Sequence, residues 1–283
     1  MQLPVIYQDD HLIAINKPSG LLVHRSEIDR HETRFALQLV RNMLGHHVFP
    51  VHRLDKPTSG VLLFAKSSEI ASLVVDQWRE RAVDKRYLAI VRGYFPESVH
   101  LDKAMSPPVD KYAKHERVKP PQEAITDFRC LAQVELPIAI DKYPQSRYSL
   151  IEALPKTGRK HQIRRHLKHL AHPIIGDARY GKGKHSRYFR DHFDAPRLLL
   201  HAWQLTMQHP VSGETLILNA PVDNVMRRLC LRFGWQQSLP DELQNWSEMV
   251  PDCMDQFFPE RDEPTCVSEI LPPPPVSTAT EPE

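Results

Sequence analysis

The chain has 283 residues, enough to bury a core as one large domain or two small ones. Its four cysteines are scattered without a CxxC pair, which argues against a disulfide framework or a zinc site and fits a reducing compartment. The N-terminal residues lack a basic segment followed by an apolar run, and no apolar stretch approaches the roughly 20 residues of a membrane span. We therefore expect a soluble, cytoplasmic protein without a signal peptide.

The net charge of +2 conceals an uneven distribution of charge along the chain. Residues 241–283 contain eleven acidic residues and one basic residue, whereas the first 240 contain 36 basic and 24 acidic residues. Within this basic part, residues 156–190 hold eleven Lys or Arg and a single acid. Scattered lysines would only keep a protein soluble, but a cluster of this density is typical of a surface that binds phosphates. The charge pattern thus predicts a polyanionic partner.

The first part of the chain predicts a hairpin, a turn, a strand and a helix. Apolar residues mark the expected strands at 5–7, 12–15 and 61–65. A turn at 8–11 joins the first two, and Lys17-Pro18-Ser19-Gly20 ends the second. A helix is expected to begin at Ser67, since Ser67-Ser68-Glu69 is a capping pattern and apolar residues follow at helical spacing as far as Trp78.

The second part of the chain is richer in strands. Strands are expected at 87–92, 124–134, 148–153, 198–201, 204–208 and 215–218. A basic helix begins near Lys160, with Ile163 and Leu167 on its buried side, and a short amphipathic helix covers 222–233. Strands occur in runs joined by hairpin turns rather than in strict alternation with helices. This order predicts an α+β fold with a mainly antiparallel mixed sheet and flanking helices.

Two stretches have the composition of irregular structure. Residues 107–121 are polar and basic between two Pro pairs, which predicts a long surface loop. Beyond about residue 240 the sequence is acidic and rich in proline, so it cannot bury enough apolar area to offset the entropy of ordering. We expect one folded domain over residues 1–245 and a disordered tail over 246–283.

One carboxylate, Asp55, lies between two cations in the segment His52-Arg53-Leu54-Asp55-Lys56-Pro57-Thr58-Ser59-Gly60. Pro57 restricts the backbone of this turn and Gly60 frees it again just before the strand at 61–65. A carboxylate beside cations is favoured in its ionised form, and on a rigid turn it is positioned to attack an electrophile. An aspartate before such a turn also often serves only as a turn or cap residue. These nine residues alone leave both interpretations open.

The same segment resembles the catalytic signature of the RluA-type pseudouridine synthases, a family that acts on stem-loops of ribosomal and transfer RNA. Three further segments resemble later motifs of that family in the same order. They are Lys85-Arg86-Tyr87, residues 155–164 and Arg197-Leu198-Leu199-Leu200-His201-Ala202. The resemblance extends from Asn16 to about residue 220. It implies a pseudouridine synthase fold with a central RNA-binding cleft.

The resemblance also implies a reaction, the isomerisation of uridine to pseudouridine. The N1–C1′ bond breaks, the uracil turns, and the base rejoins the sugar through C5. Breaking the bond builds positive charge on the sugar, as in glycoside hydrolysis. One carboxylate meets this need by attacking C1′ or by removing the 2′ proton to give a glycal, and both routes stay open. By resemblance this carboxylate is the nucleophile Asp55, and no metal or organic cofactor is required.

Two more residues acquire catalytic roles by resemblance. Tyr87 resembles the tyrosine that packs against the flipped uracil and helps to remove the C5 proton; otherwise it is an ordinary half-buried strand tyrosine. Arg164 resembles the arginine that pairs with the catalytic carboxylate. A buried bidentate pair would keep Asp55 ionised and oriented. The alternative for Arg164 is a phosphate contact from the exposed side of the basic helix.

The remaining candidates are expected to contact RNA. Arg53, two residues before Asp55, would brace the flipped-out nucleotide or its phosphate. The other expected RNA-binding residues are Arg159, Lys160, His161, Gln162, Arg165 and Lys168, which suit contacts to the RNA backbone. Four histidines fall close together at 161, 166, 169 and 172, but no Cys or acidic ligand accompanies them. We expect surface or RNA-facing histidines there, not a metal site.

Two segments indicate which branch of the family the chain resembles. They are Leu22-Val23-His24-Arg25-Ser26 and Arg164-Arg165-His166-Leu167. Both most resemble the branch that modifies uridine 65 in the T-stem of tRNA. Lys56-Pro57 also stands where many relatives with ribosomal targets carry an Arg-Asp or Arg-Glu pair. We expect a monomer that acts on tRNA.

Three alternatives compete with this interpretation: a synthase acting on ribosomal RNA, a noncatalytic RNA-binding factor on the same scaffold, and a hydrolase of the nucleoside bond. A pure binding protein needs no carboxylate in a basic groove. A hydrolase usually needs a second carboxylate to activate water, and the matching segments contain none.

Overall fold

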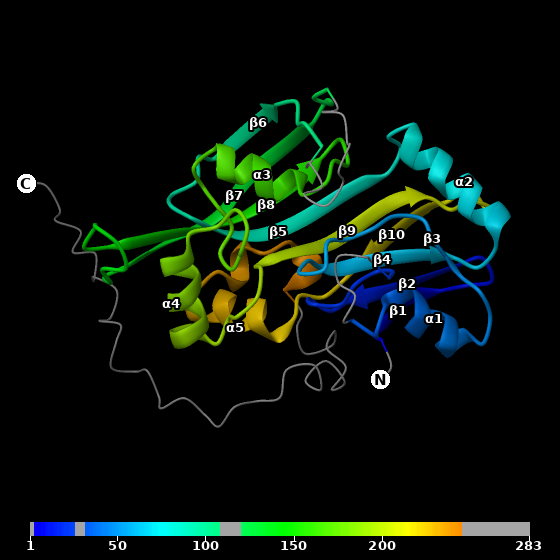
Figure 1. The fold of residues 1–283 in the computed structure, drawn as a ribbon, viewed down its shortest axis with the longest axis horizontal. Helices are drawn as coiled ribbons and strands as arrows, with labels where there is room; N and C mark the ends of the chain where they lie inside the picture. Colours follow the sequence, from blue (N-terminus) through cyan, green and yellow to red (C-terminus); the bar gives the residue numbers. More distant parts are fainter. Residues whose placement is uncertain (1–2, 26–31, 108–119, 245–283) are drawn as a thin grey trace, which may run out of the picture.

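Figure 1 shows the computed structural model of the chain, which describes residues 3–25, 32–107 and 120–244. One ten-stranded sheet runs through these residues. Its strands are β1 (Val5–Gln8), β2 (Leu12–Lys17), β3 (Phe49–Pro50), β4 (Ser59–Ala65), β5 (Asp84–Arg92), β6 (Ser98–Asp102), β7 (Ile125–Leu136), β8 (Ser146–Pro155), β9 (Leu200–Gln208) and β10 (Thr215–Asn219). The main path follows the order β1-β2-β4-β9-β5-β8-β7-β6, while β10 pairs with β9 and β3 with β4.

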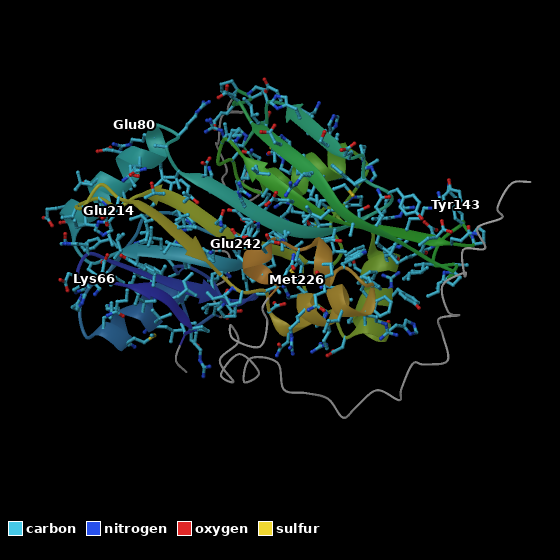
Figure 2. The ribbon with its side chains drawn as sticks, turned by 180° about the vertical axis from the view of Figure 1, so that it is seen from behind. Lys66, Glu80, Tyr143, Glu214, Met226 and Glu242 are labelled. Atoms are coloured by element: carbon cyan, nitrogen blue, oxygen red, sulfur yellow. The ribbon has the colours of Figure 1, made fainter. Side chains whose placement is uncertain are left out.

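The pairing of β4 with β9 is parallel, and every other pairing is antiparallel. This sheet, with helices beside it, confirms the predicted α+β class. Seen from behind in Figure 2, Glu214 in the β9–β10 turn and Tyr143 in the β7–β8 turn lie at opposite ends of the molecule. The sheet therefore extends along the whole length of the described fold.

The α-helices are α1 (Ala36–Leu44), α2 (Ser68–Arg79), α3 (Gln162–His169), α4 (Gly183–Phe193) and α5 (Asn224–Arg232). Two short 3-10 helices follow at Gln236–Ser238 and Asp241–Leu243. The Ser67 side chain accepts a hydrogen bond from the Ile70 N–H and caps α2, as the sequence predicts. None of the described helices is long and apolar enough to cross a membrane.

The sequence missed two helices and two strands. Helix α4 has the polar sequence GKHSRYFRDHF and buries only His185 and Phe189, so its apolar periodicity is weak. Helix α1 and the short strands β3 and β6 also lie outside the predicted elements. The two strands predicted at 198–201 and 204–208 form one strand, β9, because the chain stays extended between β4, β5 and β10. Residues 108–119 of the predicted loop and the predicted tail at 246–283 lie outside the described residues.

Strand β4 is buried along its whole length, as is its neighbour β2. Leu63 belongs to one hydrophobic cluster with Val74 of α2. Leu62 belongs to another with Val40 of α1. An uninterrupted apolar run is typical of a strand covered on both faces. The Asp55 turn leads directly into this rigid strand.

The contact between β4 and β9 requires a glycine. Gly60 lies opposite Ala202 with φ +114°, and a Cβ atom added there would lie 2.1 Å from the Ala202 carbonyl oxygen. Beside it, the Ser59 hydroxyl donates to His201 Nδ1 at 2.8 Å, and His201 Nε2–H donates to the Ala220 carbonyl at 3.1 Å. Burial lowers the pKa of His201 to about 4, so the ring is neutral and suits both bonds.

We predict that Gly60→Ala destabilises the fold by roughly 3 kcal/mol, because the new methyl group would force the two central strands apart. Gly213→Ala is the matched control: it has φ +73° but nothing within 4 Å of the added Cβ. Its cost should be about 1 kcal/mol. Urea unfolding of both variants measures the difference. Equal costs would show that the β4–β9 contact tolerates a side chain.

Candidate active site

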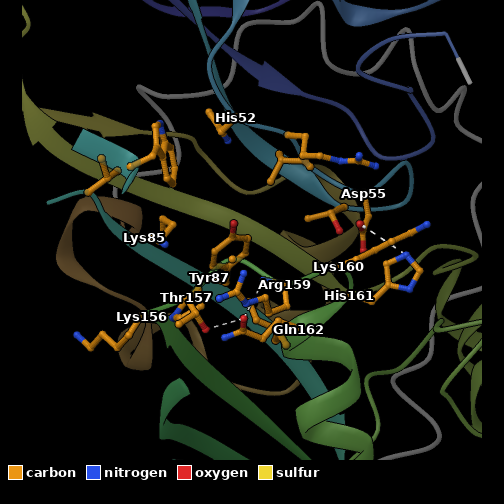
Figure 3. Close-up of a pocket in the computed structure, with 18 of the residues that line it drawn as sticks. His52, Asp55, Lys85, Tyr87, Lys156, Thr157, Arg159, Lys160, His161 and Gln162 are labelled. Atoms are coloured by element: carbon orange, nitrogen blue, oxygen red, sulfur yellow. Dashed lines mark hydrogen bonds and ion pairs between the residues drawn. The ribbon is translucent and has the colours of Figure 1, made fainter. Parts of the chain in front are cut away.

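A cavity of about 720 Å³ opens beside the Asp55 turn (Figure 3). Three segments far apart in the sequence form its wall. They are residues 51–55, strand β5 at Lys85 and Tyr87, and the stretch 155–164 from the end of β8 into α3. These segments contain three of the four motifs singled out in the sequence, and Leu200 of the fourth also lines the cavity. The fold therefore gathers them around one space.

The Asp55 carboxylate lies at the side of this cavity, with its side chain 20% exposed. Its backbone carbonyl accepts the Thr58 N–H at 3.0 Å, which closes the turn. Its Oδ2 atom accepts a hydrogen bond from Arg164 Nη1 at 3.0 Å, and its Oδ1 atom lies 3.8 Å from His161 Nε2. Among the described residues, Oδ2 accepts a hydrogen bond from a cation and Oδ1 accepts none, so Oδ1 is available to a ligand.

The Arg164 guanidinium joins two carboxylates. Besides its bond to Asp55, its Nε and Nη2 atoms donate to the two oxygens of Asp177 at 2.7 and 2.9 Å. The sequence predicts a bidentate pair of Arg164 with Asp55. In the structure the bidentate partner of Arg164 is Asp177 instead. Burial opposes the charge of the guanidinium, whose side chain is 7% exposed, but the hydrogen bonds that it donates to Asp177 and then to Asp55 hold the pKa of Arg164 above its usual value.

Asp177 is the site residue that sequence reasoning missed. Its carboxylate also accepts the backbone N–H groups of Arg179 and Tyr180, both at 2.9 Å. Burial opposes its charge, but the hydrogen bond from Arg164 holds the pKa of the Asp177 carboxyl below its usual value. One signal was present in the sequence, since Asp177 is the single acid among the eleven basic residues of 156–190. An acid alone in such a cluster is a candidate ion-pair partner.

The loop at 17–21 supports the Asp55 turn from outside the cavity. The ammonium group of Lys17, which is fully buried, donates to the carbonyl oxygens of Pro18, Leu21 and Lys56 at 2.9, 2.8 and 3.1 Å. The Gly20 N–H also donates to the Lys56 carbonyl, at 2.9 Å. Because Lys56 follows Asp55 directly, these bonds hold the catalytic candidate in place.

Tyr87 lies on β5 opposite Ala153 of β8 and Ala202 of β9, and its side chain lines the cavity. Burial, and then the negative charge of Asp55, raise the pKa of the Tyr87 phenol above its usual value. The hydroxyl group therefore keeps its proton at neutral pH. This placement suits packing against a ligand more than it suits proton removal.

The structure separates the predicted RNA-binding residues into three groups. Arg53, Arg159, Lys160 and His161 line the cavity. Gln162 also lines it, but its amide is fully used within the protein: Oε1 accepts from Thr157 and from the Arg159 N–H, and Nε2 donates to Ile125 and Thr126. It therefore fixes the loop at 157–162. Arg165 and Lys168 lie outside the cavity lining, and Arg165 donates to the Ser106 carbonyl at 3.0 Å.

The far end of the cavity holds residues to which the sequence assigned no role. His52 stacks on Trp78 with ring centroids 5.0 Å apart, and its Nε2 accepts the Leu63 N–H. Burial, and then the charge of Lys85, lower the pKa of His52 to about 3, so its ring is neutral. Lys85 itself lies over the Trp78 ring. The cationic residues at this end are Arg79, Arg81, Lys85 and Lys156, which suit a polyanion.

The histidines after position 160 have separate partners. His166 is fully buried and bonds with Thr126, so the expectation of a surface position is wrong for this residue. The reason is that it lies on the apolar side of α3, beside the buried Leu167. His172 bonds to the Arg92 carbonyl. Among the residues that the structure describes, no group of three or more His, Cys, Asp or Glu side chains is arranged to hold a metal ion.

Comparison with known proteins gives consistent matches. A family model described as RNA pseudouridylate synthase matches residues 11–169. The chain is 51% identical over 239 residues to a Vibrio cholerae protein named tRNA pseudouridine synthase C, covering 84% of this chain and 98% of the relative. It is 50% identical over 243 residues to the Pasteurella multocida protein of the same name, covering 83% and 98%.

Solved structures with the same fold include two human proteins. Human RNA pseudouridylate synthase domain containing 4 matches with a TM-score of 0.60 and 26% identity, covering 82% of this chain and 93% of the human one. Human RNA pseudouridylate synthase domain containing 1 also has a TM-score of 0.60, with 25% identity, covering 78% and 84%.

The two carboxylates on Arg164 should differ in their effect on stability. We predict that Asp177→Asn lowers the free energy of unfolding by about 3 kcal/mol, because it weakens a buried ion pair and leaves the guanidinium undercompensated. Asp55→Asn should cost no more than about 1 kcal/mol, since the guanidinium keeps Asp177 and the Asp55 side chain is partly exposed. Urea unfolding of the two matched variants tests this order, and the reverse order would contradict it.

Proposed function

Because this chain belongs to the RNA pseudouridylate synthase family, we propose that it isomerises uridine to pseudouridine in tRNA, at uridine 65 of the T-stem. The observation that carries this proposal is Asp55, which Arg164 binds through one carboxylate oxygen at 3.0 Å in a cavity lined with cations. Relatives about 50% identical over most of the chain bear the name tRNA pseudouridine synthase C, which supports tRNA as the substrate.

In the proposed mechanism Asp55 acts at the sugar of the target uridine. Its Oδ2 atom is held by Arg164, so Oδ1 is the oxygen that faces the substrate. Positive charge develops at C1′ as the N1–C1′ bond breaks, and Oδ1 meets it by attacking C1′ or by removing the 2′ proton. Arg164 orients the carboxylate through this hydrogen bond. Asp177 in turn fixes the Arg164 guanidinium, so Asp177 is a positioning residue.

The RNA contacts follow from the lining of the cavity. Tyr87 packs against the flipped uracil, and Arg53, exposed at the rim, braces the gap that the nucleotide leaves. Arg159 and Lys160 contact the RNA backbone, which gives affinity and no sequence information. Arg165 and Lys168 stay candidates for contacts beyond the cavity. We further expect a cytoplasmic monomer.

A hydrolase of the nucleoside bond is disfavoured by the state of the second carboxylate. Asp177 lies close to Asp55, but both of its oxygens are bound to Arg164 and it is buried. A carboxylate held in this way has no free oxygen with which to activate water.

We predict that the wild-type protein releases tritium from tRNA transcripts that carry 5-tritiated uridine, and that Asp55→Ala releases none while it still binds the tRNA. Loss of the carboxylate removes the group that acts on the sugar, but it leaves the cationic lining intact. Mapping the product to its position in the tRNA tests the T-stem assignment. Equal tritium release by both proteins would rule out Asp55 as the catalytic residue.

We also predict that truncation after residue 245 leaves turnover unchanged. The relatives match about 240 residues of this chain, and residues 246–283 are acidic and proline-rich. The measurement is the same tritium release, made with the full chain as control. A large loss of turnover would show that the proposed catalytic domain extends into the C-terminal segment.

A further inference from the structure

The last chemical step of the proposed reaction needs a base. Once the C5–C1′ bond has formed, C5 carries both the new bond and its original hydrogen. A base must remove this proton to restore the C5=C6 double bond. Because Asp55 acts at C1′ or at its neighbour C2′ in either route, the base must lie close to the Asp55 carboxylate.

Among the residues that the structure describes, two basic side chains come within 4 Å of this carboxylate: Arg164 at 3.0 Å and His161 at 3.8 Å. Arg164 is a permanent cation bound to two carboxylates, so it has no lone pair for a proton. Tyr87 lies in the same cavity, but burial raises the pKa of its phenol, which therefore stays protonated. Of these three side chains, His161 is the one that can accept a proton at neutral pH.

The orientation of His161 is fixed from both sides. Its backbone has φ +58°, a left-handed conformation that is rare for a residue other than glycine. Its Nδ1 lies 3.0 Å from the Tyr180 hydroxyl, and the two rings are packed edge to face. These contacts leave Nε2 directed at Asp55 Oδ1, and Figure 3 shows the two side chains next to each other at one side of the cavity, joined by a dashed line. Strained backbone of this kind is often retained at functional sites.

We propose that His161 is a catalytic residue, the base that removes the C5 proton through Nε2. This assignment rests on the proposed function and adds a step to it. The proton leaves C5 for Nε2, the electron pair of the C–H bond becomes the C5=C6 double bond, and the π pair of the N1=C6 bond moves onto N1. N1 takes a proton from solvent, and His161 returns its own proton to solvent. No proton is gained or lost overall.

The charges around His161 set its working pH range. The groups facing it are Asp55, Tyr180, Arg164, Lys160 and Arg179. Burial, opposed by Asp55 and assisted by the three cations, lowers the pKa of His161 below its ordinary 6.5. The ring is therefore neutral at pH 7, as a base must be. We expect the rate of pseudouridine formation to be level around pH 7 and to fall as the pH drops through the His161 pKa.

The test uses His161→Asn in the full chain. Asn tolerates a left-handed backbone but cannot act as the base, and urea unfolding checks that the variant folds. His169→Asn is the matched control, because His169 is exposed at the end of the same helix and does not line the cavity. Single-turnover rates are measured on two tRNA transcripts, one with uridine and one with 5-fluorouridine. The second has no proton at C5, so its reaction stops after the C5–C1′ bond forms.

We expect His161→Asn to slow pseudouridine formation from uridine on the order of 10²-fold. The variant should still consume N1-linked 5-fluorouridine at the wild-type rate, because that reaction needs no C5 base. A primary isotope effect from deuterium at C5 should appear in the variant. The fall of the rate below pH 6.5 that is expected for the wild type should be absent in the variant. His169→Asn should match the wild type on both transcripts.

Two outcomes would overturn the assignment of His161. Equal slowing of both transcripts would show that His161 only positions Asp55. An unchanged rate on uridine would show that another group, such as Asp55 itself, removes the proton. Failure of the proposed function gives a different pattern, since the wild-type protein would then form no pseudouridine in either the test or the control series.

Discussion

The close approach of β4 and β9 at Gly60 and Ala202 joins the two parts of the sheet, and the site depends on it. Strand β4 brings the Asp55 turn from one part, while β5, β8 and α3 bring Tyr87, the loop at 157–162 and Arg164 from the other. The parallel β4–β9 pair joins these two parts of the sheet. Because a Cβ at Gly60 would lie 2.1 Å from the Ala202 carbonyl, the distance across the cavity is set by backbone packing and not by flexible side chains.

The hydrogen bonds of Arg164 are shared between two carboxylates in a way that leaves Oδ1 of Asp55 available to a ligand. Asp177 takes two of the three hydrogen bonds that the Arg164 guanidinium donates to carboxylates, and Asp55 takes the third. Had Asp55 been the bidentate partner, both of its oxygens would be occupied and neither would face a substrate. The arrangement therefore gives Asp55 a fixed orientation and an unoccupied oxygen at the same time. The buried Lys17 adds a second restraint, acting on the backbone beside Asp55.

How much of this could be predicted from the sequence depends on how far apart the interacting residues lie. The hairpin at 5–17, the cap at Ser67 and the Asp55 turn follow from neighbouring residues, so local patterns predicted them. The bond between Arg164 and Asp177 spans 13 residues and that to Asp55 spans 109, and periodicity carries no information on such pairs. Helix α4 was missed for another reason, because it buries few apolar residues. His166 was misplaced because a polar residue on the buried side of a helix resembles a surface residue.

Two backbone positions with positive φ help to place the residues of the site. Gly60 and His161 both have positive φ, and they lie on the two segments that carry Asp55 and Arg164. Glycine adopts its conformation at Gly60 without steric cost, whereas a histidine at φ +58° must be held there by its surroundings, here the Tyr180 hydroxyl and the Gln162 network next to it. A histidine needed only for its charge or its bulk would not need this backbone. The strain is explained if Nε2 must point at Asp55 Oδ1, since the regular helical conformation that begins at Gln162 would direct the ring elsewhere.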